Sequence, residues 1–203
     1  MQINNVTRVA GYHLRNIAFI KKYVDENIIL KLVHNHVISR LDYCNSLYYG
    51  LPRYQLRKLQ NIMNRAVRLI KGLSPYDRVT PSLMELHWLP VKARIEYKLC
   101  LLTFQALKFG KPDYLRKMLE GFSVDSGIVL RHSSEPGRLN EPLCNSSLGF
   151  CSFKFGGPRL YNKLLISVRE SNSLDVFRSR LKTFYFDHSY DLVSKTITEH
   201  YRL

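Results

Sequence analysis

The chain has 203 residues, of which 45% are hydrophobic and 23% are charged, so it can bury a sizeable core and has the composition of an ordinary folded protein. Its 31 Lys and Arg residues outnumber its 16 Asp and Glu residues, which gives a formal net charge of +15. A surplus this large favours polyanionic partners, either nucleic acid or an acidic membrane surface, over a basic surface that is only solvated.

The N-terminus lacks the apolar segment of a signal peptide, and no run approaches the length of a membrane span. We therefore expect a protein that is cytoplasmic, nuclear or both, and not secreted. The four cysteines are scattered without a Cys-x-x-Cys pair, so zinc ligation is not expected. Cys44 and Cys100 fall within apolar helical patterns, and we expect both to be buried free thiols.

The first third of the chain predicts two helices. Apolar residues recur at helical spacing over 3–23, and a separate stripe seven residues apart is basic: Arg8, Arg15 and Lys22. Asp25 and Glu26 suit the N-terminus of a second helix, which the apolar spacing extends to about Tyr48. Gly50 and Pro52 then predict a stop.

The stretch that follows, up to Lys71, is the most informative in the chain. At about 100° per residue, one half of the predicted helix is apolar and the other half is basic and amide-bearing. No acid occurs between Tyr43 and Tyr76. A solvated helix face usually mixes both charge signs, so we favour a partner-binding surface over a merely solvated one. Its candidate binding residues are Arg57, Lys58, Arg65, Arg68 and Lys71.

The rest of the chain is also predicted to be mainly helical. Pro90 separates a short helix that ends near Trp88 from a longer one over 91–109, and Trp88 is expected to be a core anchor. A short helix over 110–121 precedes a loop-rich stretch, 122–157, with at most a short β-hairpin. Ser173 suits the N-cap of a helix over about 173–186. The predicted fold class is therefore mainly α.

No catalytic constellation stands out. The chain contains no paired aspartates, no nucleophile elbow and no phosphate-binding glycine loop. His34 and His36 straddle a helix, and His87 has no acid or nucleophile near it in sequence, so structural roles are expected. Asp187 and Asp191 are four residues apart, but a solvated pair of acids is favoured over a metal site. The residues alone thus predict a cationic helical binding module without a cofactor.

Five segments, in this order, resemble the C-terminal part of the reverse transcriptases of LINE-type (non-LTR) retrotransposons, with jockey-like and related elements the most similar: YHLRNI at 12–17, SRLDYCNSLYYGLP at 39–52, LQNIMNRAVRLI at 59–70, LHWLPVKARIEYK at 86–98 and FRSRLKTFYF at 177–186. The match covers about residues 5–187. One departure is Tyr-Asn-Lys-Leu-Leu at 161–165, where the family commonly has Trp-Asn-x-Leu-Pro.

The resemblance implies a helical, thumb-like domain over 1–110, a post-thumb segment over 111–190 and a tail over 191–203. It implies a non-catalytic fragment of an RNA-directed DNA polymerase that grips the backbone of an RNA–DNA or RNA template–primer duplex. The palm aspartates and the endonuclease of that family are not in these residues, so we expect the chain to be inactive alone and to depend on those domains. Arg8, Arg15 and Lys22 would join the five cations above as phosphate contacts.

Two other readings stay open. A helical protein–protein interaction module derived from such an element is suggested by aromatic residues that look exposed, among them Tyr43, Tyr48, Tyr49 and Tyr54. A binder of anionic membrane surfaces is disfavoured, because large apolar residues do not interleave with the basic face.

Overall fold

The computed structural model describes residues 2–120 and 138–200, with side chains at all of these positions except 120, 147, 148 and 191–200. Helices make up most of the described chain and no strand occurs in it, so the prediction of a mainly α fold is confirmed. Part of the expected loop-rich stretch lies outside the described residues. None of the described helices combines the length and apolar character needed to cross a membrane.

The chain divides into two compact units. The N-terminal unit comprises Met1–Leu47 and Leu51–Arg94, and the C-terminal unit comprises Tyr48–Gly50 and Ile95–Leu203. The boundary therefore falls inside helix α6 (Val91–Phe109). The domain boundary at residue 110 that the resemblance implies stays a prediction.

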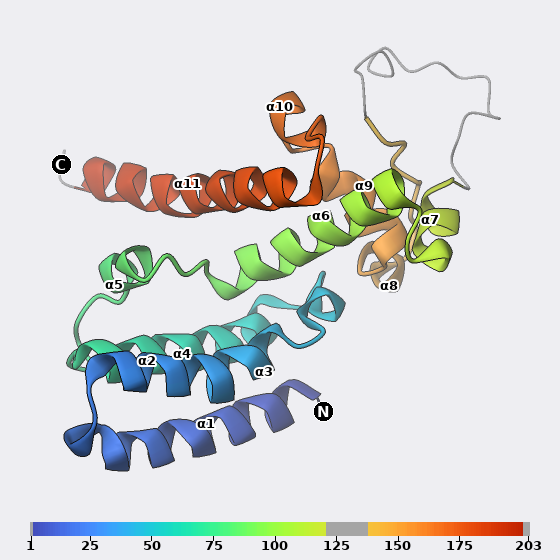
Figure 1. Ribbon diagram of the computed structural model, residues 1–203. Helices are drawn as coiled ribbons and strands as arrows, with labels where there is room; N and C mark the ends of the chain where they lie inside the picture. The colour runs from blue at the N-terminus through green and yellow to red at the C-terminus, as the bar shows by residue number, and fades with distance from the viewer. Residues whose placement is uncertain (1, 121–137, 201–203) are drawn as a thin grey trace. The chain divides into compact units, whose positions relative to one another are not determined.

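The N-terminal unit is built around two long helices, α1 (Gln2–Ile20) and α4 (Arg53–Lys71). They run in the same direction, and the segment from α2 (Glu26–Val33) to α3 (Ser39–Asp42) runs back against them (Figure 1). Apolar residues from all of these elements form the core, among them Ala10, Leu14, Ile29, Val33, Val37, Leu59, Met63 and Val67. Helix α5 (Thr80–Glu85) follows, and Trp88 is buried, as predicted.

The second helix ends earlier than its apolar spacing predicts. Helices α2 and α3 are joined by a π-helical turn, η2 (His34–Ile38), and the helical segment stops at Asp42. Tyr43 is extended, with ψ at 118°, and Cys44 has a φ of 50°, a left-handed conformation that breaks the helix. A 3-10 turn, η3 (Asn45–Tyr48), follows. Cys44 is consequently exposed, and its expected burial was wrong.

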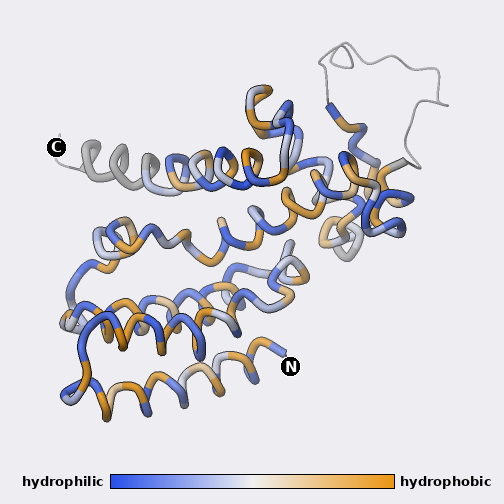
Figure 2. Tube along the Cα trace, viewed as in Figure 1, coloured by the Kyte–Doolittle hydropathy of each residue, from blue (hydrophilic) through white to orange (hydrophobic). Residues whose placement is uncertain are grey.

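Helix α4 has the two faces that its sequence predicts. Hydrophobic and hydrophilic residues alternate along it (Figure 2), and its apolar face is buried. The helix ends because Gly72 adopts the left-handed conformation (φ 65°), so that its N–H and that of Leu73 both donate to the carbonyl of Arg68.

The core of the C-terminal unit forms on α6. Phe104 stacks on Phe177 at 3.9 Å between ring centroids, and Cys100 is buried, as predicted. The other helices of this unit are α7 (Asp113–Glu120), α8 (Ser147–Phe150), α9 (Phe153–Tyr161), α10 (Ile166–Arg169) and α11 (Leu174–His200). Ser173 Oγ accepts a hydrogen bond from the N–H of Val176 at the start of α11, and the helix continues past its expected end near residue 186.

Candidate nucleic-acid interface

Most of the net positive charge lies in the N-terminal unit. Its residues include 15 Lys and Arg against five Asp and Glu, so it carries +10 of the formal charge of +15. Neither α1 nor α4 contains an acidic residue. An acid-free pair of helices that carries most of the charge is where a polyanion would be attracted most strongly.

Three contacts fix the register between α1 and α4. The Nζ atom of Lys58 donates to Asn4 Oδ1 at 2.9 Å, and Lys21 Nζ donates to the carbonyl of Leu69 at 2.5 Å. Between them, a Cβ atom placed on Gly11 would lie 3.9 Å from the guanidinium of Arg65. Residue numbers rise together along these contacts, so the two helices are parallel and start at nearly the same level.

This register brings the two predicted basic stripes onto one surface. Lys58 and Arg65 are seven residues apart and point toward Asn4 and Gly11, which are also seven apart. Arg8 and Arg15 follow Asn4 and Gly11 by four residues and therefore lie about 40° further round α1, on the solvent side of the contact. Arg57 is exposed on the outer side of α4. We call Arg8, Arg15, Arg57, Lys58 and Arg65 the cationic face.

The cationic face is free of neutralising partners. In the described part of the chain, none of its five members makes an ion pair, although Arg8 donates to Asn5 Oδ1 at 3.1 Å. Because seven helical residues rise about 10.5 Å, Arg8 and Arg15 are separated by roughly that distance along α1, as Lys58 and Arg65 are along α4. The result is a two-row array of guanidinium and ammonium groups on rigid elements.

The remaining three predicted cations are placed differently. Lys71 is half-buried and bridges Glu26 at 3.0 Å and Glu85 at 2.7 Å. The hydrogen bonds that it donates, the one to Glu85 first, raise the pKa of its ammonium group. Arg68 donates to the carbonyl of Asp77 at 3.3 Å. Lys22 lies beyond the end of α1, with its Nζ 4.8 Å from the centroid of the Tyr23 ring.

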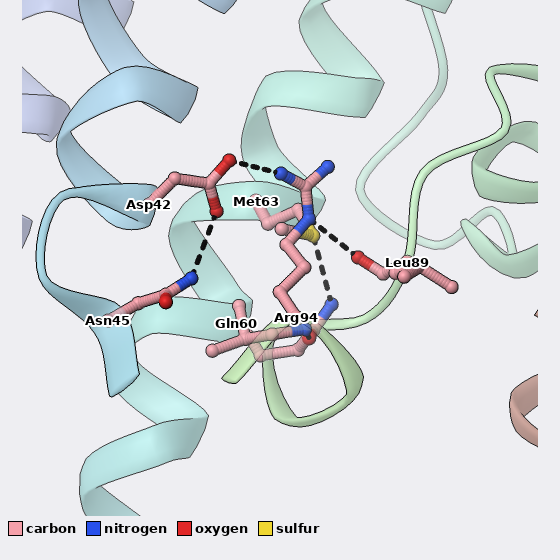
Figure 3. A network of polar contacts seen from close by, with 7 residues as sticks. Asp42, Asn45, Gln60, Met63, Leu89 and Arg94 are labelled. Atoms are coloured by element: carbon pink, nitrogen blue, oxygen red, sulfur yellow. Dashed lines mark hydrogen bonds and ion pairs between the residues drawn. The ribbon is translucent and has the colours of Figure 1, made fainter. Parts of the chain in front are cut away.

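The edge of α4 that faces away from α1 is held by a polar network (Figure 3). Arg94 donates to Asp42 Oδ2 at 2.6 Å and to the carbonyl of Leu89 at 2.9 Å. On α4, Gln60 accepts from the N–H of Val91 at 2.8 Å and donates to Asn64 at 2.8 Å. The bond from Val91 to Gln60 ties α4 to the start of α6, and Gln60 lies about 200° around α4 from Lys58, on the side away from α1.

Four of the five acids of the N-terminal unit are engaged away from the cationic face. Glu26 and Glu85 face Lys71, Asp42 faces Arg94, and Asp77 accepts from the N–H of Ser74 at 2.7 Å. Asp25 precedes the first turn of α2. Sequence spacing predicted each basic stripe separately, but only this distribution shows which cations are free, because the partners of Lys71 come from distant parts of the chain.

The histidines whose side chains the structure describes form no ligand set for a metal. His13 and His36 stack with ring centroids 5.3 Å apart and nearly parallel planes, which does not aim their nitrogen atoms at a common point. Among the side chains that the structure describes, no group of three or more His, Cys, Asp and Glu residues could hold a metal ion. The side chain of Asp191 lies outside the described part, so the Asp187–Asp191 pair is not tested.

No protein-family model matches the chain, and neither a curated protein nor a solved structure matches it.

Proposed function

We propose that the chain binds nucleic acid non-catalytically, by contacts from the cationic face to the sugar–phosphate backbone of a duplex. The observation that carries the proposal is the parallel packing of α1 and α4, which brings together the five members of the cationic face, none of which has an ion-pair partner among the described residues. Phosphate contacts position a protein on nucleic acid without reading its sequence. Such a surface suits a ligand whose sequence varies.

The resemblance to LINE-type reverse transcriptases makes the proposal more specific. A thumb-like origin assigns an RNA–DNA or RNA template–primer duplex as the ligand, and the palm and endonuclease of such an element as the domains that do the chemistry. A cytoplasmic or nuclear location follows from that role. Within the proposal, this chain grips the duplex and does not itself polymerise.

Salt dependence of binding tests this function. We expect the affinity of the full chain for an RNA–DNA duplex to fall linearly with salt on a log–log scale, by about 0.9 for each phosphate neutralised. Replacing Lys58 and Arg65 by Ala should lower that slope by about 2 and weaken binding to every sequence alike. Replacing Lys163 and Lys182, which are exposed and lie in the C-terminal unit, removes the same charge and should leave most of the slope.

An affinity that does not change with salt, or a slope that the two pairs of substitutions lower equally, would rule out the cationic face as the binding surface. For the alternative, a protein-interaction module, Tyr43 and Tyr54 remain candidate contact residues because they are exposed, but Tyr48 does not because it is buried. A partner captured equally at low and high salt, with no retention of nucleic acid, would favour that alternative.

A further inference from the structure

Helix α1 presents two large aromatic side chains to solvent. Tyr12 and Phe19 are 53% and 76% exposed, whereas Ala10 and Leu14 of the same helix are buried. They are seven residues apart, so they share one row along the helix. Leaving a Phe ring in water forgoes the stabilisation that its burial would bring, and such a row is a candidate contact surface.

Each of these rings lies one turn beyond a cation of the cationic face. Tyr12 follows Arg8 by four residues and Phe19 follows Arg15 by four, a spacing that brings side chains about 5–6 Å apart at Cβ. The unit of one arginine and one aromatic ring is thus repeated along α1. Tyr12 also contacts His13 in a T-shaped arrangement, with ring centroids 5.6 Å apart, and about half of its surface still stays exposed.

A third exposed aromatic residue with a cation follows just beyond the end of α1. Tyr23 is 74% exposed, and Lys22 sits over one face of its ring. On α4, Tyr54 is exposed one turn before Lys58. Exposed rings and unpaired cations therefore alternate over the surface that the two helices share, and α1 and α4 contribute no acid to it.

We propose that this row of α1 binds an unpaired strand of nucleic acid, with bases stacked on Tyr12 and Phe19 and phosphates at Arg8 and Arg15. Proteins hold single-stranded nucleic acid by this combination, since every base has a face that stacks on an aromatic ring and every nucleotide carries a negative charge. Paired bases are already stacked on each other and cannot use such rings. The inference rests on the proposed function and adds a single-stranded extension to its duplex ligand.

The chemistry of the row disfavours the other occupants. An acidic protein segment would use the arginines but gains little from flat rings in particular, and an anionic membrane needs a continuous large apolar face. RNA and DNA share the stacking and the charge, so the row by itself does not choose between them. The test therefore includes both an RNA and a DNA single strand.

The test compares three probes on the full chain: a single-stranded RNA, a single-stranded DNA of the same sequence and a blunt RNA–DNA duplex. Replacing Tyr12 and Phe19 together by Ala should weaken binding of one or both single strands by about tenfold or more for each ring, while the affinity for the blunt duplex and its salt slope stay unchanged. Tyr114→Ala removes a ring that is equally exposed in the C-terminal unit and should change nothing.

Two conservative variants separate stacking from other apolar contacts. Phe19→Trp should keep single-strand binding and Phe19→Leu should lose most of it, because leucine preserves apolar area but offers no aromatic face. Equal binding by Phe19→Leu and wild type, or unchanged single-strand affinity in the double Ala variant, would overturn the proposal and leave the duplex function standing. If the double Ala variant loses binding only to phosphatidylserine vesicles, the row is a membrane contact instead. If the wild-type chain binds none of the nucleic-acid probes, both proposals fail.

Discussion

The Nζ atom of Lys71 lies 2.7 Å from Oε1 of Glu85, and the same ammonium group lies 3.0 Å from Oε1 of Glu26. One cation at the end of α4 thereby joins the first turn of α2 to the last residue of α5. Lys71 lies in the same basic half of α4 as its free cations, but its charge is already matched by two carboxylates. The structural role of Lys71 and the binding role of the free cations can be separated by substitution.

We expect Lys71→Met to lower the stability of the N-terminal unit and to leave the salt slope of duplex binding unchanged. Methionine keeps the apolar stem but leaves Glu26 and Glu85 facing each other without a cation. Because folding raises the pKa of Lys71 above 10.5, its contribution is complete below pH 10.5 and is lost as pH rises through the folded-state value. Urea unfolding at neutral pH measures the first effect. Arg65→Ala should behave in the opposite way, with weaker binding and little change in stability.

Gly156 packs against the ring of Tyr49 too closely for any side chain. A Cβ atom at Gly156 would lie 3.0 Å from Cδ2 of Leu99 and closer still to the Tyr49 ring. We expect Gly156→Ala to destabilise the C-terminal unit by about 1–3 kcal/mol, as overpacking does. Gly11→Ala is the matched control, because its Cβ would meet nothing nearer than 3.9 Å and alanine should stabilise α1 by about 0.5–1 kcal/mol. Equal losses of stability in both variants would contradict this packing.

The four thiols should differ in reactivity. Burial raises the pKa of the Cys100 thiol to about 12, an effect that its contact with Tyr185 Oη at 3.3 Å only partly offsets. Thiolate is the reactive form, so Cys100 should resist alkylation in the native protein at pH 8, whereas the exposed Cys44 should react. Mass spectrometry after brief treatment with iodoacetamide measures both sites. Protection of Cys100 should disappear in urea, and modification of Cys100 at the rate of Cys44 without urea would show that the core opens readily.

His13 should make the stability of the N-terminal unit depend on pH. Burial, followed by the charges of Arg40 and His36, lowers the pKa of His13 below 6.5. The unfolded state therefore binds the proton more readily, so stability is greatest above pH 6.5 and falls as pH drops through that value, until it levels off below the folded-state pKa. In urea unfolding between pH 7.5 and 5, His13→Gln should lose less stability than wild type. A parallel loss in both proteins would assign the pH dependence to other groups.

Local sequence predicted the helices and their faces well where a single period runs without interruption. The division of α4 into apolar and basic halves, the basic stripe of α1 and the burial of Trp88 follow from side-chain spacing and size. The prediction failed at Cys44, because an apolar residue at helical spacing does not reveal that the chain turns left-handed there. The rings of Tyr12 and Phe19 were overlooked, although their spacing of seven matches that of Arg8 and Arg15.

The sequence by itself determined that this protein is helical and strongly basic and that its cations gather in stripes, because amphipathic period and charge are properties of each segment alone. Only the tertiary structure decided that two of those stripes share one surface and that Lys71 is withdrawn from it. The parallel register of α1 and α4 and the carboxylates around Lys71 arise from contacts between residues far apart in the chain. Such contacts depend on how helices pack, which no single helix encodes.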